Sequence, residues 1–292
     1  MNTGPAGLRW QRRTPFLASG DDYPSAKAVL LGAPMDWSSS FRPGSRFGPA
    51  SIREVSEGIE EYSPYADRSL CELAFYDAGD LILPFGNVRA SLEIIEEAVA
   101  AVLDGGKFPL LLGGEHLVTY AALRAFRARY PNLSVLHLDA HADLRPAYLG
   151  EEMSHASVMR LVHGLLGDGR IFQCGIRSGE REEFAFAGAH TRLYRGGLAE
   201  AVLAAAEEIA DRPLYVSLDI DVVDPAFAPG TGTPECGGAT SAELLAALAG
   251  LAGRRVVGFD LVEVSPPTDL SARTSLLAAT VVREALLRFA AV

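Results

Sequence analysis

The stretch SVLHLDAHADLRP, residues 134–146, decides the fold and carries most of the chemistry that can be read from the chain. It begins as a short run of aliphatic and β-branched residues, which is typical of a buried strand. Asp139, His141 and Asp143 then follow at alternate positions. Because side chains two residues apart on an extended backbone point to the same face, we predict that these three potential metal ligands project together from one strand end.

Two further stretches repeat this pattern. LYVSLDIDVVDP, residues 214–225, begins with alternating apolar residues that predict another strand, and Asp219 and Asp221 follow at its end. PLLLGGEHLVTY, residues 109–120, adds His116 just beyond a strand and a Gly-Gly turn. Carboxylates paired on one face repel each other unless a cation or a proton lies between them, so the pattern indicates a metal site at the carboxyl edge of a parallel sheet.

The candidate ligands are rich in oxygen, with a minority of imidazole, which favours a fairly hard divalent ion such as Mn²⁺ over Zn²⁺. They are too many for one ion in a compact site with room for water. The residues therefore predict a centre of two ions, about 3.5–4 Å apart. The six candidate ligands are His116, Asp139, His141, Asp143, Asp219 and Asp221.

The composition is that of one large α/β domain. The chain has 292 residues, of which 49% are hydrophobic and 22% are charged, so a large core is available and disorder is not favoured. We predict one domain over residues 1–292, with about residues 1–26 forming an N-terminal arm on the surface or at an oligomer contact. The formal net charge of -11 argues against nucleic acid as a partner and is compatible with a small cationic substrate.

The cysteines and the hydropathy pattern indicate a cytoplasmic protein. Cys71, Cys174 and Cys236 are far apart and form no C-x-x-C pair, so a reducing compartment is expected. No apolar stretch reaches the ~20 residues that a membrane span needs. The basic N-terminus lacks the apolar region of a secretory signal.

Predicted helices and strands alternate along the chain, which indicates a largely parallel sheet with helices on both faces. Outside the three stretches above, we predict strands at residues 28–34, 72–80, 170–177, 191–194 and 254–267. We predict helices at residues 49–56, 91–106, 118–130, 156–166, 179–186, 198–211, 240–253 and 275–290, with Ser91 capping the second of them.

Five motifs, taken together and in this order, resemble the ureohydrolase family of arginases, agmatinases and related guanidino hydrolases. They are GGEH at 113–116, DAHAD at 139–143, SHAS at 154–157, SLDIDVVDPAFAPGTGTPECGG at 217–238 and VEVSP at 262–266. The likeness extends from the loop RPGSRFGP at 42–49 to the last helix. It implies a three-layer arginase-like α/β fold with a central eight-stranded, mostly parallel sheet, two Mn²⁺ ions per chain, and a trimeric or hexameric homo-oligomer.

The resemblance also implies residue roles. It assigns His116 and Asp143 to one ion, His141 and Asp221 to the other, and Asp139 and Asp219 to both. In the implied mechanism, water activated by the ions attacks the guanidinium carbon, which Glu263 holds in place. Asp143 passes a proton to the departing amine, and His155 exchanges protons with solvent. The resemblance implies no functional role for His137 or His163.

Two departures from the arginase pattern bear on the substrate. Arg145 stands where arginases have an Asn that helps to hold the α-carboxylate, and the loop 145–153 is similar to that of bacterial and archaeal agmatinases. Agmatine is therefore the implied substrate, with Glu151 and Glu152 as candidate partners of its ammonium end. Arg145 either faces the pocket and attracts a carboxylate or pairs with one of these two acids. A third departure, Glu115 in place of a common Asp, keeps the charge beside His116.

Three alternatives stay open at this stage. The first keeps the chemistry and changes the tail of the substrate, to N1-aminopropylagmatine or 4-guanidinobutyrate. The second is a zinc deacetylase of the related fold, although a single zinc needs fewer than six ligands. The third is a non-catalytic metal-binding or assembly subunit, against which the presence of Glu263 and His155 argues.

Overall fold

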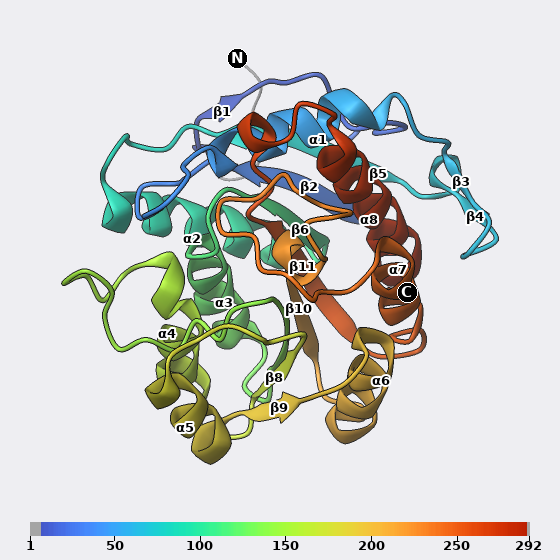
Figure 1. Cartoon of the computed structure of the whole chain (residues 1–292). Helices are drawn as coiled ribbons and strands as arrows, with labels where there is room; N and C mark the ends of the chain where they lie inside the picture. The colour runs from blue at the N-terminus through green and yellow to red at the C-terminus, as the bar shows by residue number, and fades with distance from the viewer. Residues whose placement is uncertain (1–6, 291–292) are drawn as a thin grey trace.

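The computed structural model describes residues 7–290 and arranges them in three layers, with helices on both faces of a central sheet (Figure 1). The sheet has nine strands in the order β1-β5-β2-β6-β11-β10-β7-β8-β9. All neighbouring pairs are parallel except β1 and β5, which are antiparallel. The predicted fold class is confirmed. The predicted eight strands correspond to the parallel ones, and the ninth is the short edge strand β1.

The strands of the main sheet are β1 (Trp10–Gln11), β2 (Ala28–Ala33), β5 (Phe75–Leu81), β6 (Phe108–Gly113), β7 (Ser134–Leu138), β8 (Ile171–Cys174), β9 (Arg192–Tyr194), β10 (Leu214–Asp219) and β11 (Val256–Val262). The helices are α1 (Gly48–Ser56), α2 (Val88–Asp104), α3 (Val118–Arg129), α4 (Val158–Leu166), α5 (Arg181–His190), α6 (Leu198–Ile209), α7 (Ser241–Ala249) and α8 (Arg273–Phe289). A separate two-stranded sheet consists of β3 (Tyr62–Ser63) and β4 (Arg68–Ser69).

The two faces of the sheet carry separate apolar cores, because successive residues of each strand point to opposite faces. Leu30 of β2 and Val216 of β10 belong to the core that α1, α6, α7 and α8 cover. Leu31 and Tyr215 belong to the core on the other face, under α2, α3, α4 and α5. Both faces of the central strands are thus buried, which explains their nearly continuous apolar sequences.

The N-terminal segment that we predicted as an arm is described from residue 7 onward. Its residues Trp10 and Gln11 pair with Leu81 and Asp80 and extend the sheet at one edge. Phe16 is only 1% exposed and packs edge-on against Phe75, with 6.4 Å between the ring centroids. This part of the segment therefore lies against the sheet, whereas residues 1–6 are outside the described range.

The four strands in the middle of the sheet position the candidate site. β6, β11, β10 and β7 are neighbours, and all run parallel. His116 follows β6, Asp139 follows β7, Asp219 ends β10 and Glu263 follows β11. Because the carboxyl ends of parallel strands share one edge, residues far apart in the sequence meet there. Among residues 7–290, no helix combines the length and apolar character that crossing a membrane requires.

Candidate metal centre and active site

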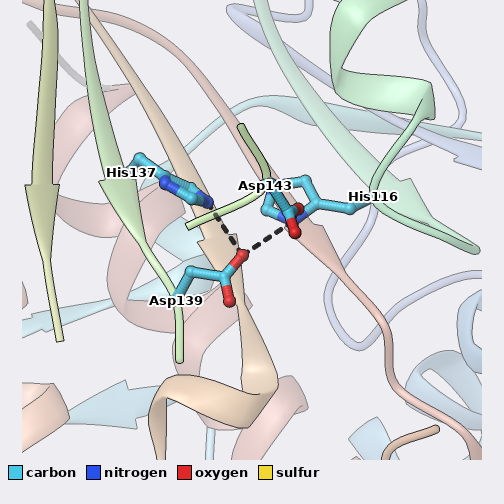
Figure 2. A group of neighbouring side chains, drawn as sticks. All are labelled: His116, His137, Asp139 and Asp143. Atoms are coloured by element: carbon cyan, nitrogen blue, oxygen red, sulfur yellow. Dashed lines mark hydrogen bonds and ion pairs between the residues drawn. The ribbon is translucent and has the colours of Figure 1, made fainter. Parts of the chain in front are cut away.

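A histidine and three aspartates meet at this edge of the sheet. His116 Nδ1 lies 3.0 Å from Asp139 Oδ2, 3.3 Å from Asp143 Oδ2 and 3.4 Å from Asp219 Oδ2. All four side chains are buried. Figure 2 shows the Asp139 carboxylate between the rings of His116 and His137, with Asp143 beside His116.

A second cluster shares Asp139 with the first. His141 Nδ1 lies 2.9 Å from Asp221 Oδ2 and 3.5 Å from Asp139 Oδ1. Asp139 thus presents one oxygen to each cluster. Asp219 is tied to the second cluster as well, since its Oδ1 accepts the backbone N–H of Asp221 at 2.8 Å. The structure brings together all six residues that the sequence pattern singled out.

The local backbone explains how the carboxylates that follow β7 and β10 come to lie close together. Asp139 Oδ1 accepts the N–H of His141 at 2.6 Å, which is the same side-chain turn that Asp219 makes with Asp221. Asp143 and Glu263 have positive φ values, 54° and 62°. A non-glycine residue in this region is uncommon, and such strain gathers at functional sites.

The donor set fits divalent cations. His116 Nδ1 and Asp221 Oδ2 are buried without a hydrogen-bond partner among the described residues, although carboxylates and imidazoles surround them. Burial, and then the charges of Asp221 and Asp139, raise the pKa of Asp219 well above its usual value. Crowded carboxylates of this kind become favourable when a cation shares them, and carboxylate oxygens with some imidazole suit Mn²⁺.

His137 supports this cluster, although the sequence analysis gave it no role. Its Nε2 lies 2.8 Å from Asp139 Oδ2, and its Nδ1 is 3.1 Å from Gln173 Nε2. Since the Gln173 amide donates to Nδ1, the hydrogen of the neutral ring sits on Nε2 and is donated to Asp139. His137 therefore orients a carboxylate that belongs to both clusters. His137 lies two residues before Asp139 and points to the same face of the strand, and this spacing could have predicted the contact.

Residues of both clusters, among them His116, Asp143 and His141, line a cavity of about 280 Å³. Its walls include the predicted residues Arg145, His155 and Glu263, together with acidic residues of the segment before and within α5. The lining residues are Ser40, His116, His141, Ala142, Asp143, Arg145, Tyr148, His155, Ala156, Ser178, Gly179, Glu180, Glu183, Asp219, Thr233 and Glu263.

Glu263 is a buried carboxylate with room for a cation. Its Oε1 accepts the backbone N–H of His116 at 2.8 Å, and the residue is 8% exposed. Burial, and next the charge of Glu115, raise the pKa of Glu263 to about 8. A cationic group that entered the cavity would favour the charged form of this carboxylate.

His155 is held by a serine that the sequence analysis did not identify. The hydroxyl of Ser38 donates to Glu115 Oε2 at 2.6 Å and accepts the backbone N–H of His155 at 3.0 Å. The same hydroxyl lies 3.4 Å from His155 Nδ1. Burial lowers the pKa of His155, which keeps the ring neutral at pH 7. Glu115, which the sequence pattern indicated only as keeping the charge beside His116, is the buried acceptor that fixes this hydroxyl.

Arg145 corrects one prediction. Its Nη1 lies 2.8 Å from Glu180 Oε1 and its Nε lies 3.5 Å from Glu183 Oε2, so its partners are not Glu151 or Glu152. The guanidinium also lies over the ring of Tyr148, 4.9 Å from the centroid. The sequence offered an acidic run at 180–183, but its approach to Arg145 depends on tertiary structure.

Glu151 and Glu152 do not line the cavity that contains His116 and Glu263. They line a neighbouring hollow with Trp37 and Phe85. The physical reason is a tight turn in the loop, in which the backbones of Tyr148 and Glu151 bond to each other in both directions, at 2.8 and 2.9 Å. The tip of this turn, Leu149 and Gly150, lines the same hollow as the two acids, and none of these residues lines the cavity that contains His116.

The fold agrees with the comparisons to known proteins. The model of the arginase family matches residues 26–288, and the chain belongs to this family. It is an enzyme of the ureohydrolase class. An agmatinase of Bacillus cereus is 51% identical over 275 residues, 93% of this chain and 95% of that protein.

Two further relatives agree with this one. An agmatinase of Bacillus subtilis is 50% identical over 279 residues, 94% of this chain and 96% of that protein. The crystal structure of an agmatine ureohydrolase of Thermoplasma volcanium superposes with a TM-score of 0.87 at 34% identity, covering 95% of this chain and 94% of that one. The resemblance seen in the motifs therefore extends over almost the whole fold.

Proposed function

We propose that this enzyme is a manganese-dependent agmatinase, which converts agmatine and water into putrescine and urea. The observation that carries the proposal is the charge of the cavity wall. Among the described lining residues, Arg145 is the only Lys or Arg, and it faces two carboxylates, Glu180 and Glu183. Agmatine is cationic at both ends and has no carboxylate, so it suits this wall better than a guanidino acid.

The six clustered residues would hold two Mn²⁺ ions. When bound, such ions lower the pKa of a water molecule so that hydroxide is available near neutral pH, and they stabilise the negative charge that develops as the guanidinium carbon is attacked. The residues that would hold them are His116, Asp139, His141, Asp143, Asp219 and Asp221, as the spacing in the sequence predicts.

The remaining steps belong to side chains of the cavity. Glu263 would bind the guanidinium through charge-assisted hydrogen bonds and hold the reacting carbon in place. Asp143, which lines the same cavity, would pass a proton to the amine as the carbon–nitrogen bond breaks. His155, neutral because burial lowers its pKa, would exchange that proton with solvent.

The far end of agmatine would lie near Arg145, Glu180 and Glu183. One cation against two carboxylates leaves this group with a net negative charge, which favours an ammonium over a carboxylate. Glu180 and Glu183 thus replace Glu151 and Glu152 as the proposed partners of the tail. The longer N1-aminopropylagmatine shares this charge pattern and stays an alternative, while 4-guanidinobutyrate would require Arg145 to leave its two partners.

The test compares kcat/KM for agmatine, arginine and 4-guanidinobutyrate with Mn²⁺-loaded protein. We expect agmatine to be preferred over arginine by at least ~10²-fold, about 2.7 kcal/mol in transition-state terms. Arg145→Ala should leave this order unchanged. A clear preference for either carboxylate substrate would show that the agmatinase assignment is wrong, while ureohydrolase chemistry would stand.

A further inference from the structure

The six histidines of the chain fall into two groups. Four lie at the candidate centre, and the other two, His163 and His190, meet at the surface on the carboxylate of Asp168. His163 Nε2 and His190 Nδ1 each lie 2.8 Å from the same oxygen, Asp168 Oδ1. The three atoms are close enough together to bind one ion.

The backbone and an aromatic side chain hold these rings in position. His163 lies in the last turn of α4, His190 is the last residue of α5, and Asp168 lies in the loop after α4. Phe186 packs against both rings, with centroid distances of 4.9 Å to His163 and 4.3 Å to His190. The two imidazoles are therefore oriented by packing within the protein, so little order would have to be imposed by a ligand.

We propose that His163, Asp168 and His190 bind one divalent transition metal ion of the zinc type, at a site separate from the candidate active centre. Two imidazole nitrogens and one carboxylate oxygen are a donor set that Zn²⁺ accepts, with water in the fourth position. The side chain of Asp168 is 69% exposed, which gives an ion and its water access from solvent. Each imidazole would bind the ion through its neutral form, as metal coordination by histidine requires.

The geometry requires one small adjustment. Ligand atoms on a tetrahedral zinc at about 2.0–2.1 Å are roughly 3.3 Å apart, so the two nitrogen–oxygen distances would open by about half an ångström. Asp168 lies between Gly167 and Gly169, both with positive φ, 83° and 66°. Added Cβ atoms at these glycines would have no contact closer than 3.5 Å, so the loop has room to make this shift.

The site would connect two helices that begin at the cavity. His155 and Ala156 line the cavity just before α4, and Glu180 and Glu183 line it at the start of α5. An ion bound at the opposite ends of α4 and α5 would fix these helices to each other and stabilise the wall they form. The site itself does not depend on the identity of the substrate.

The test uses Mn²⁺-loaded protein dialysed to equilibrium against Zn²⁺, with zinc measured by elemental analysis. We expect the wild type to hold one zinc per chain more than the His163→Asn/His190→Asn double variant. Zinc that enters the active centre is the same in both proteins, so the difference isolates the surface site. Zn²⁺ should also raise the Tm of the wild type more than that of the variant. Equal zinc contents would overturn the proposal.

A second variant distinguishes the loss of a metal ligand from altered packing of the two histidine rings in the first variant. Asp168→Ala changes an exposed loop residue, and we expect it to weaken zinc binding at the surface site by at least ~10-fold, as the loss of one of three ligands implies. Asp211→Ala, which removes an exposed aspartate elsewhere, is the matched control and should bind zinc as the wild type does. Unchanged zinc binding by Asp168→Ala would count against the site. Agmatine hydrolysis at saturating Mn²⁺ should be the same in all these proteins.

Discussion

Asp139 shows how the candidate centre depends on single side chains. Its Oδ2 contacts His116 and His137, and its Oδ1 accepts the N–H of His141. The sequence predicted the ligands because they alternate along strand ends, which is a local pattern. It could not predict Ser38, which is 77 residues from its partner Glu115 and 117 from His155, because only the folded chain brings these segments together.

Glu263→Gln tests the residue that we propose binds the guanidinium. The substitution keeps the size of the side chain and removes its charge, so the substrate cation would lose its buried partner. We expect kcat/KM for agmatine to fall by roughly 10²-fold or more, about 3 kcal/mol, which is typical of breaking a buried ion pair. The bound metal should stay unchanged, because Glu263 is not among the six ligands. Steady-state kinetics and elemental analysis measure the two quantities.

The matched control for this variant is Glu207→Gln, an exposed glutamate on α6. It should retain wild-type kinetics. A near-normal kcat/KM in Glu263→Gln with full metal content would refute the role of Glu263.

Ser38→Ala tests whether the hydroxyl that bonds Glu115 positions His155. Because the Ser38 hydrogen is donated to Glu115, its oxygen can only accept from His155, which favours the tautomer with the hydrogen on Nδ1 and leaves Nε2 free to accept a proton. We expect kcat to fall by roughly 10-fold, with little change in KM, since general acid–base assistance contributes about 10²–10⁴-fold in full.

Two further variants show whether the hydroxyl group of Ser38 is responsible for the effect. Ser38→Thr retains the hydroxyl and should recover most of the rate, whereas Ser39→Ala, on the same loop, should behave as wild type. If Ser38→Ala changes KM alone, the hydroxyl acts on substrate binding and not on His155.

At the scale of helices and strands, the alternating pattern predicted every parallel strand of the sheet, and the ends moved by a few residues. The predicted cap of the second helix was wrong. Asn87 caps α2 by accepting the N–H of Ala90 at 3.1 Å, while the buried Ser91 hydroxyl donates to Asn87 O. Edge strand β1 was missed because two residues carry no periodicity, and its pairing comes from β5.

Asp269→Ala tests the start of α8, where the N-cap residue, Ala272, has no side chain that could cap the helix. Asp269 Oδ2 accepts from both the N–H and the hydroxyl of Thr274 at 2.8 Å, and its Oδ1 accepts from the N–H and hydroxyl of Ser271. Loss of a cap costs typically about 1 kcal/mol and up to about 2. We expect the free energy of unfolding at pH 7 to fall by about 1–2 kcal/mol, measured in urea, and Asp211→Ala to change it little.

The effect of Asp269→Ala should depend on pH. Burial raises the pKa of Asp269, but the hydrogen bonds from Ser271 and Thr274 outweigh burial and hold it below its usual value. A depressed pKa in the folded state means that the stabilisation is present above the unfolded-state pKa, about 3.9, and is lost as the pH falls through the folded-state value. The difference between wild type and variant should therefore be constant from pH 7 to about 5 and shrink below about 4. A difference that grows on acidification would contradict this assignment.

At the scale of the whole molecule, the strand order explains why one site collects residues from four separate stretches. β6, β11, β10 and β7 are adjacent and parallel, so their carboxyl ends form one continuous edge. This order could not be derived from the local sequence, because it depends on which strands pair. The family resemblance supplied only the class of fold and the mostly parallel sheet. The assembly into a trimer or hexamer, and the single domain over residues 1–292, stay predictions, and light scattering of the purified protein measures the first.

The number of metal ions tests the centre as a whole. Six ligands divided between two ions predict that fully active protein binds two Mn²⁺ per chain, and that chelation removes both the activity and part of the stability, because ions that bind only the folded state stabilise it by mass action. His116→Asn and His141→Asn should each weaken the binding of one ion, so that each variant retains about one Mn²⁺ per chain. Asp139→Asn should weaken the binding of both ions, since the two oxygens of Asp139 face different clusters.

Elemental analysis of each protein at matched Mn²⁺ concentrations measures these contents, and thermal unfolding with increasing Mn²⁺ measures the stabilisation. Glu207→Gln is again the control and should retain two ions. A fully active wild type with one tightly bound zinc would exclude the two-manganese centre. So would equal losses in all three ligand variants, because a single shared ion depends on each of its ligands alike, whereas two ions joined by Asp139 do not.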